Sequence, residues 1–137
     1  MARRGAKVII GCRRTDGLKE KIEATIPNSQ IDVFHLDLSL KQSVLDFCRK
    51  VKAGHDKIHV LINNSAIVSR PENSESANTR EMSEDGKHEL TMATNYIGHC
   101  ILNNELMDLV AAAGQDGLCL DIPRLHMIQS QLHQPLF

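Results

Sequence analysis

Three short runs of apolar, mostly β-branched residues occur in the first half of the chain. Their alternation with helical patterns limits the fold more than any other feature. The runs are Lys7–Gly11, Asp32–Leu36 and Ile58–Ile62. The first and third are almost continuously apolar, which is typical of strands in a parallel sheet whose two faces are both covered. We therefore expect three strands at these positions.

Helical patterns lie between these runs. Thr15 is a predicted helix N-cap, and the apolar residues of 18–26 recur every four positions. Ser39 is followed three residues later by Gln42, which predicts a capping box at the start of a second helix. Gly54 stands where a left-handed C-terminal cap is expected. The apolar stripe of this second helix comprises Leu40, Val44, Phe47, Cys48 and Val51.

The second half of the chain is less regular. The polar segment 69–86 predicts a long surface loop, and a third helix is predicted over Lys87–Ala112 and ends at Gly114. Residues 114–137 show no sustained period. Alternating strands and helices imply βαβ units with right-handed crossovers. We therefore predict an α/β fold with an incomplete, doubly wound parallel sheet of Rossmann type in residues 1–113. We expect no strand after residue 110 and a divergent tail over 114–137.

The composition narrows the classes of function. The 137 residues include 16 Lys and Arg against 17 Asp and Glu, and only 3% are aromatic. We expect no nucleic-acid partner, because such proteins carry a basic excess or aromatic stacking platforms. No apolar run approaches the ~20 residues that span a bilayer, so membrane association is not visible. The four cysteines form no Cys-x-x-Cys pair, which favours reduced thiols in a compartment like the cytosol.

The carboxyl ends of the strands are the expected ligand-binding positions of a doubly wound sheet. In chain order they carry Cys12-Arg13-Arg14, Asp37-Leu38 and Asn63-Asn64-Ser65-Ala66. A fold that prefers NAD usually has an acidic residue at the first of these ends. An arginine there suits a 2′-phosphate, because its planar guanidinium matches the geometry and the charge of phosphate. The alternative is a solvated loop with two surface arginines.

Three asparagines are candidate site residues. Asn63 and Asn64 could bridge neighbouring backbone groups, or they could form a simple turn, because Asn tolerates left-handed geometry. Asn95 lies within the predicted third helix, although Asn is a mediocre helix former. It could bind the free carbonyl of a bend, hold a water or face solvent. The residues alone leave these alternatives open.

Five segments resemble, in order and spacing, the short-chain dehydrogenase/reductase family, and more narrowly its retinol dehydrogenase-like branch. They are Ala2–Arg13, Leu36–Ser39, Leu61–Ala66, Asp85-Gly86 and Thr94–His99. The resemblance covers about residues 1–110. It implies hydride transfer between NADP(H) and a lipophilic alcohol or aldehyde such as retinol or retinal.

The resemblance also implies roles for individual residues. Arg13 would contact the 2′-phosphate of NADP, with Arg14 as a helper. Asp37 and Leu38 would border the adenine. Asn63, Asn64, Ser65 and Ala66 stand where the family has Asn-Asn-Ala-Gly, which supports the sheet and borders the nicotinamide side. Asn95 would be the catalytic asparagine, which holds the water that links the family's catalytic lysine to a proton relay.

The sequence departs from the family's pattern at three places. The turn Thr-Gly-x-x-x-Gly-x-Gly, which cradles the pyrophosphate, has no counterpart. The single tyrosine, Tyr96, is followed four residues later by Cys100 where the catalytic motif has lysine, so the general acid is absent. Ala66 replaces a glycine, and alanine in a left-handed conformation would be strained by about 1 kcal/mol.

These departures predict a fragment of an NADP-dependent oxidoreductase, truncated at both ends and inactive as given. The main alternative is a non-catalytic binding or regulatory partner that pairs with full-length relatives through exposed strand edges. A second alternative is an unrelated α/β domain of flavodoxin-like type.

The expected order of the strands predicts an interval in the sheet that no strand fills. In this fold the spatial order is 3-2-1-4-5-6, and the three expected strands correspond to the second, third and fourth. An interval of two strand spacings, roughly 10 Å, would then separate two unpaired edges. Either the last strand slides across to close the interval, or the chain is marginally stable. We expect low stability and aggregation.

Overall fold

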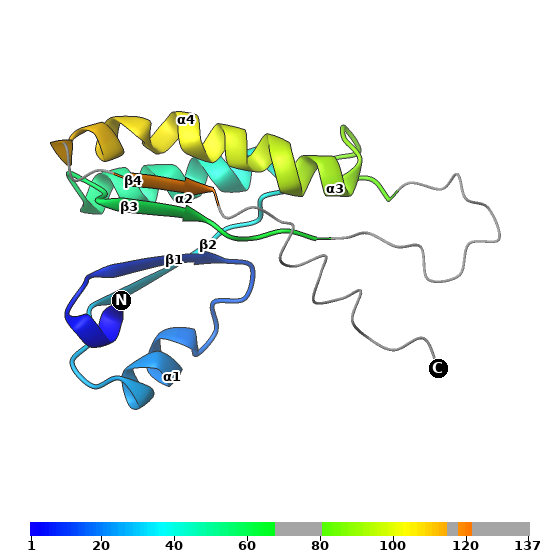
Figure 1. Ribbon diagram of the computed structural model, residues 1–137. Coiled ribbons are helices and arrows are strands. Elements are labelled where there is room, and N and C mark those ends of the chain that lie inside the picture. Colours follow the sequence, from blue (N-terminus) through cyan, green and yellow to red (C-terminus); the bar gives the residue numbers. More distant parts are fainter. Residues whose placement is uncertain (68–80, 115–117, 122–137) are drawn as a thin grey trace, which may run out of the picture.

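The computed structural model describes residues 1–67, 81–114 and 118–121, so most of the predicted 69–86 loop and the tail beyond 121 lie outside the described residues. The elements in chain order are a 3-10 turn (Ala2–Arg4), β1 (Val8–Cys12), α1 (Leu18–Thr25), β2 (Ile31–His35), α2 (Lys41–Gly54), β3 (Val60–Asn63), α3 (Leu90–Met92), a π-helical stretch (Ala93–Ile97), α4 (Gly98–Ala111) and β4 (Leu118–Asp121). Figure 1 shows their arrangement. The predicted α/β class with parallel strands is confirmed.

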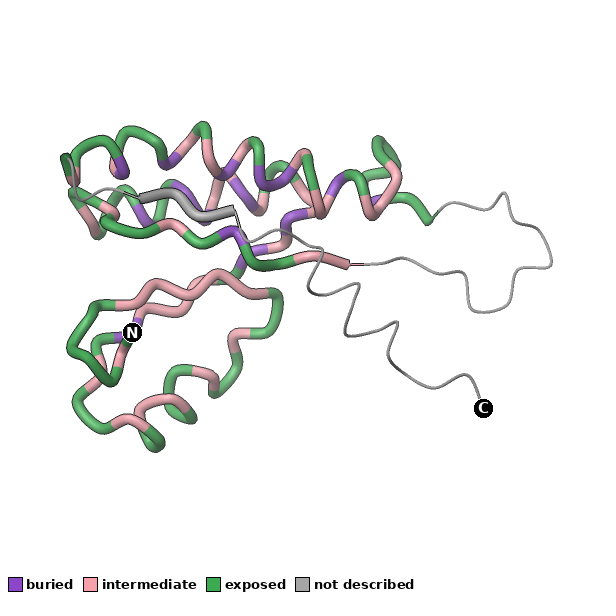
Figure 2. Tube along the Cα trace, in the orientation of Figure 1, coloured by how far each residue is buried: buried purple, intermediate pink, exposed green. Residues whose placement is uncertain are grey.

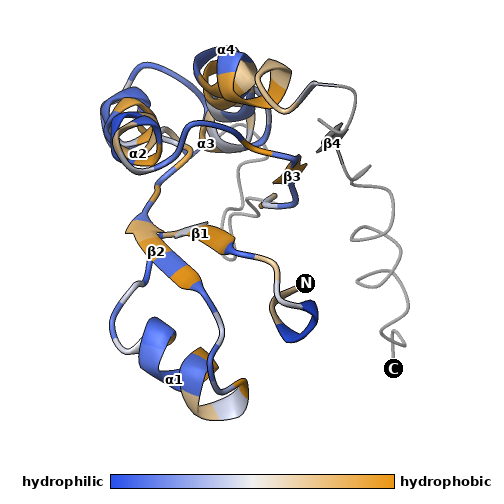
Figure 3. Ribbon diagram, turned by 90° about the vertical axis from the view of Figure 1, so that its left-hand side faces the viewer, coloured by the Kyte–Doolittle hydropathy of each residue, from blue (hydrophilic) through white to orange (hydrophobic). Residues whose placement is uncertain are grey.

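The strands form two parallel pairs. β1 pairs with β2, with Val8 opposite Ile31, and β3 pairs with β4, with Val60 opposite Leu118. In Figure 3, β1 lies between β2 and β3. β3 does not slide across to pair with β1. The expectation of no strand after residue 110 is wrong, because a run of four residues is too short to show a period and gains its partner from β3 only in the folded chain.

The core lies between α2, α4 and the segment that follows β2. The apolar stripe of α2 faces α4, and Figure 2 shows the buried sides of these two helices turned toward each other. In contrast, α1 has no buried residue and β1 is only half-buried throughout. Within the described ranges, no helix is long and apolar enough to cross a membrane. The buried core cluster comprises Leu36, Leu38, Val44, Phe47, Cys48, Val51, Leu102 and Leu106.

Two predicted helix ends are wrong. α1 begins at Leu18 behind Gly17, which has a φ of 63°. Thr15 is not the cap, because its carbonyl accepts the N–H of Leu18 in a turn that precedes the helix. Gly54 remains helical, and His55 ends α2 in an extended conformation. Both the start of α1 and the end of α2 depend on the backbone conformation of the residues next to the helix. The residue types at the caps do not determine this conformation.

The predicted capping box at α2 does not form. The Asp37 carboxylate accepts the N–H of Ser39 at 2.8 Å and its hydroxyl at 2.6 Å. These two bonds hold Ser39 in a turn that precedes the helix, and Leu40 is the N-cap. The Gln42 amide donates to Asp46 further along the helix.

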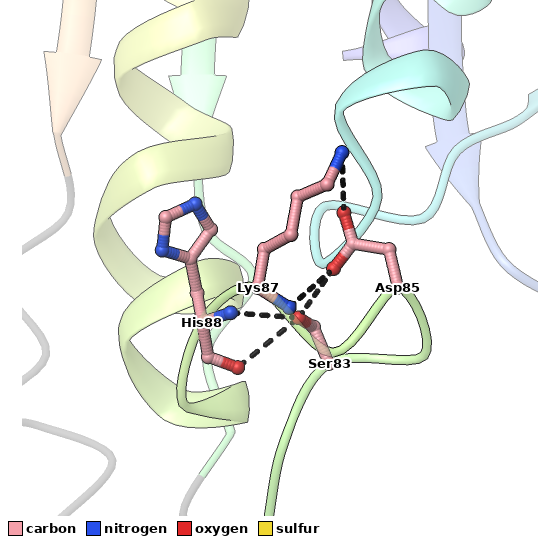
Figure 4. A network of polar contacts seen from close by, with 4 residues as sticks. All are labelled: Ser83, Asp85, Lys87 and His88. Carbon is pink, nitrogen blue, oxygen red and sulfur yellow. Dashed lines mark hydrogen bonds and ion pairs between the residues drawn. The ribbon is translucent and has the colours of Figure 1, made fainter.

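The third helix begins three residues later than predicted, at Leu90, because a tight polar turn occupies its expected start (Figure 4). The Ser83 hydroxyl donates to Asp85 at 2.7 Å, and the N–H of His88 donates to the Ser83 oxygen at 3.2 Å. Gly86 holds the turn with a φ of 68°. At the other end, α4 ends at Ala111 with Ala112 as its C-cap, two residues before the predicted Gly114, which has a φ of 68°.

Candidate functional site

The carboxyl ends of β1, β2 and β3 meet at one cavity of about 340 Å³. The sequence analysis placed its candidate residues at these three ends, and six of them line this cavity. They are Arg13, Asp37, Leu38, Asn64, Ser65 and Ala66. The structure therefore brings together residues that are up to 53 positions apart in the chain, from Arg13 to Ala66.

Two arginines follow β1, and they differ in position. Arg13 is exposed and lines the cavity, whereas Arg14 is exposed and lies outside its lining. The Cys12 thiol donates to the Arg14 carbonyl at 3.1 Å, which fixes this turn. No ion pair within the described part of the chain involves either guanidinium. The charge of Arg13 is thus available to an anion in the cavity.

The segment after β2 is held by hydrogen bonds of Asp37. Besides the two bonds from Ser39, the N–H of Asp37 donates to the hydroxyl of Ser43 at 2.9 Å. Leu38 is only 7% exposed, because its side chain belongs to the core. Asp37 and Leu38 therefore form a rigid wall of the cavity.

The segment after β3 is anchored to α4. Asn63 is 7% exposed, and its amide donates to Asn103 at 2.8 Å. The carbonyl of Ser65 accepts Nε2–H of His99 at 2.8 Å. Asn64 and Ser65 are exposed at the cavity, and Ala66 is half-buried. The expected strain at Ala66 is wrong, because its φ is not positive.

Asn95 also holds the segment after β3, through two hydrogen bonds to its backbone. Its Oδ1 accepts the N–H of Ile67 and its Nδ2 donates to the carbonyl of Ile67, each at 2.8 Å. Of the alternatives left open, the structure therefore has the one in which Asn95 binds a free backbone carbonyl, and it excludes a solvent-facing side chain. Asn95 lies in the π-helical stretch, a geometry that is frequent at functional sites. It does not line the cavity.

The comparison with known sequences assigns the chain to a family. The sequence model of the short chain dehydrogenase family matches residues 1–122. The chain belongs to this family. The match includes β4 as well as the three strand ends that form the cavity.

Curated relatives carry names of several short-chain dehydrogenases. The chain is 37% identical over 116 residues to Short-chain dehydrogenase TIC 32 B, chloroplastic, from Brassica napus, and the match covers 82% of this chain and 33% of that protein. It is 34% identical over 110 residues to Retinol dehydrogenase 12 from Bos taurus, and the match covers 78% of this chain and 32% of that protein. This short-chain dehydrogenase chain thus spans about a third of the length of the curated relatives that it matches.

Solved structures agree on the fold. The alcohol dehydrogenase from the archaeon Thermococcus sibiricus, complexed with 5-hydroxy-NADP, is 28% identical and superposes with a TM-score of 0.64, over 88% of this chain and 48% of that chain. A protein from Mycobacterium paratuberculosis is 33% identical, with a TM-score of 0.57 over 79% of this chain and 35% of that chain. The incomplete Rossmann-type fold is therefore confirmed.

The candidate site also contains residues that the sequence analysis did not select. Ile67 extends the wall after β3, and Leu90 and Thr94 close the cavity from the helical side. Leu90 and Thr94 are four residues apart on one helical face, and that spacing could have identified them. No pattern pointed to Ile67, because its place depends on the long-range contact with Asn95.

Proposed function

We propose that the chain is the part of an NADP-dependent short-chain oxidoreductase that binds the adenosine end of the cofactor. The observation that carries this proposal is the cavity at the three strand ends, whose wall includes the exposed guanidinium of Arg13. A volume of about 340 Å³ falls at the lower end of the range for small-molecule sites and suits a nucleoside rather than a whole dinucleotide.

The residues present fit the proposed cofactor. Arg13 supplies a planar donor with positive charge for the 2′-phosphate, and Arg14 is the helper on the same turn. Asp37 and Leu38 border the adenine. Asn64, Ser65 and Ala66 line the same cavity on the side that leads toward the nicotinamide. Asn63 and Asn95 act as positioning residues in this proposal, because their amides hold the segment after β3 in place.

The proposed reaction of the whole protein is hydride transfer between NADP(H) and a lipophilic alcohol or aldehyde, such as retinol or retinal. When bound, the nicotinamide would accept the hydride from an alcohol or supply it to an aldehyde. Relatives named Retinol dehydrogenase 12, Retinol dehydrogenase 13 and Polyprenol dehydrogenase support a lipophilic substrate. The chain's own Tyr96 is 62% exposed and precedes Cys100 by four residues. We therefore expect no NADPH-dependent reduction of retinal by the purified 137-residue chain, and measured turnover would contradict this expectation.

The test of the proposed site compares two nucleotides that differ by one phosphate. Calorimetric titration should show that adenosine 2′,5′-bisphosphate binds at least about 10-fold tighter than adenosine 5′-monophosphate. The reason is that hydrogen bonds to charged groups contribute about 1.5–3 kcal/mol each. Arg13→Ala should abolish this preference. Arg4→Ala is the matched control, because Arg4 is exposed and lies outside the cavity.

Two outcomes would contradict the proposal. One is equal affinity of the unaltered chain for both nucleotides. The other is a preference for the bisphosphate that survives in Arg13→Ala, since the 2′-phosphate would then be bound elsewhere.

A further inference from the structure

Three polar side chains lie four residues apart on the helical segment beside the end of β3. They are Asn95 in the π-helical stretch and His99 and Asn103 in α4. Residues at this spacing lie above one another on one face of a helix. We call these three residues the polar stripe. The family resemblance gives a role to Asn95 but none to His99 or Asn103.

The polar stripe contacts the segment after β3 at every second residue. Each contact is a hydrogen bond of 2.8 Å, and the segment and the helix run in opposite directions. The first contact joins two side-chain amides, and the other two join side chains of the stripe to main-chain groups of the segment. The pairs are Asn63 with Asn103, Ser65 with His99, and Ile67 with Asn95.

The spacing of these pairs agrees with an extended segment beside a helix. Four residues of a helix rise about 6 Å, and two residues of an extended chain rise about 6.6 Å. The contacts therefore repeat without a change in the distance between the segment and the helix. Asn64 and Ala66 alternate with the contacts, and both line the cavity at the strand ends.

The polar stripe acts where the ladder of β3 ends. Among the described strands, β3 pairs with β4 only up to Asn63, which is opposite Asp121. The main-chain groups of Ser65 and Ile67 therefore need partners of another kind, because peptide groups without partners cost free energy where water is excluded. His99 is 9% exposed, and a hydrogen bond in such surroundings is stronger than one in water.

The same helical segment also forms the opposite side of the cavity. Leu90 and Thr94 line the cavity from the helical side, and Asn64, Ser65 and Ala66 line it from the segment after β3. The separation of these two sides therefore depends on the hydrogen bonds of the polar stripe.

We propose that His99 and Asn103 are positioning residues of the nucleotide site, which hold the segment after β3 at the distance from the helix that a bound adenosine requires. The proposal rests on the proposed function, because this distance matters for binding only if the nucleotide occupies the cavity. Neither side chain lines the cavity, so both act through the residues that they hold. The polar stripe sets the shape of the site, whereas Arg13 sets its preference for a phosphate.

The test uses four variants of the 137-residue chain. His99→Phe keeps a ring and removes the donor, and His99→Gln restores an N–H donor near the position of Nε2. Asn103→Leu removes the acceptor at similar volume. Asn104→Leu is the matched control, because Asn104 is the exposed neighbour of Asn103 on the same helix. Circular dichroism verifies that all four variants keep the helical signal of the unaltered chain.

The first measurement is hydrogen exchange without nucleotide, followed by nuclear magnetic resonance. His99→Phe and Asn103→Leu should each speed exchange at the Ile67 amide at least about tenfold relative to the amides of Val44 and Val51. These two valines are 0% and 1% exposed in α2 and report global opening, so the ratio removes any general loss of stability. His99→Gln should restore the ratio of the unaltered chain, and Asn104→Leu should leave it unchanged.

The second measurement is calorimetric titration with adenosine 2′,5′-bisphosphate and adenosine 5′-monophosphate. His99→Phe and Asn103→Leu should weaken the binding of both nucleotides by the same factor, at least about fivefold. The factor is the same because the segment after β3 contacts the nucleoside that the two nucleotides share. The preference for the bisphosphate should therefore persist in these variants, in contrast to Arg13→Ala.

Three results would overturn the proposal. The first is exchange at Ile67 that changes no more than exchange at the α2 amides, since the contacts would then serve global stability alone. The second is faster exchange at Ile67 with unchanged nucleotide affinity. The third is a loss of binding in His99→Gln as large as in His99→Phe. An unaltered chain that binds neither nucleotide contradicts the proposed function itself, and the exchange ratio then still decides whether the polar stripe holds the segment.

Discussion

At the scale of single residues, Cys48 and Cys100 differ in how far they are buried. Cys48 is 1% exposed between α2 and α4, and desolvation together with the nearby Glu105 carboxylate raises the pKa of its thiol from 9.0 to about 11. Cys100 is exposed. The nucleophile in alkylation is the thiolate, and a pKa about two units higher lowers its fraction about 100-fold at pH 8.

We therefore predict that iodoacetamide at pH 8 labels Cys100 at least about 100-fold faster than Cys48 in the folded chain. Mass spectrometry of tryptic peptides over time measures both rates. In concentrated urea the two rates should become similar. Equal rates under folding conditions would show that Cys48 is not buried between the helices.

The sequence predicted single residues well where a rule of the fold applies and poorly where a distant partner decides. Arg13, Asp37 and Asn64 were selected because strand ends in a doubly wound sheet converge, and all three line one cavity. The bond of Asn63 to Asn103, across 40 residues, has no local signal. The capping box failed for a local reason, because the carboxylate of Asp37, two residues earlier, holds the Ser39 hydroxyl in a turn.

At the scale of elements, α4 is positioned by a close approach to the segment after β2. A Cβ placed on Gly98 would overlap the carbonyl oxygen of Leu38. Only glycine therefore allows this approach, and Leu38 lines the cavity at the strand ends. The same helix follows the π-helical stretch that carries Asn95. The close packing of α4 against the strand ends thus requires glycine at position 98, because a Cβ atom there would overlap this carbonyl oxygen.

Gly98→Ala should lower the free energy of unfolding by about 1–3 kcal/mol, because the helix has to move away from a rigid carbonyl. Gly54→Ala is the matched control, since Gly54 is also helical and a Cβ there meets no atom. It should raise stability by up to about 1 kcal/mol. Urea denaturation followed by circular dichroism measures both changes, and a neutral Gly98→Ala would contradict the packing described for α4.

Elements with a strong period were predicted within a few residues, whereas short ones were not. β1, β2, α1 and α2 overlap the predicted positions, because their apolar residues recur with the period of a strand or a helix. β4 has four residues and was missed. The third helix was predicted as one piece. The turn at Ser83 moves its start to Leu90, and the π-helical stretch separates α3 from α4.

At the scale of the whole molecule, the two strand pairs are unequally supported. The pair of β3 and β4 lies beside the core between α2 and α4, whereas β1, β2 and α1 contribute one fully buried residue, Ile31. Marginal burial and free strand edges both reduce the stability of a small domain. The expected low stability and aggregation stay predictions.

We predict that the 137-residue chain does not melt as a monodisperse, cooperative monomer above about 60 °C. Scanning calorimetry combined with light scattering tests this prediction. A cooperative monomeric transition above that temperature would show that the strand edges are satisfied in another way.

The central claim, that the three strand ends form one site for a 2′-phosphorylated adenosine, can be tested most directly by nuclear magnetic resonance. Amide shifts of the labelled chain would be followed during titration with adenosine 2′,5′-bisphosphate. The account predicts saturable shifts that cluster at Gly11–Arg13, Asp37–Ser39 and Asn64–Ile67, with the largest at Arg13. Shifts confined to one of these segments, or centred outside all three, would contradict it.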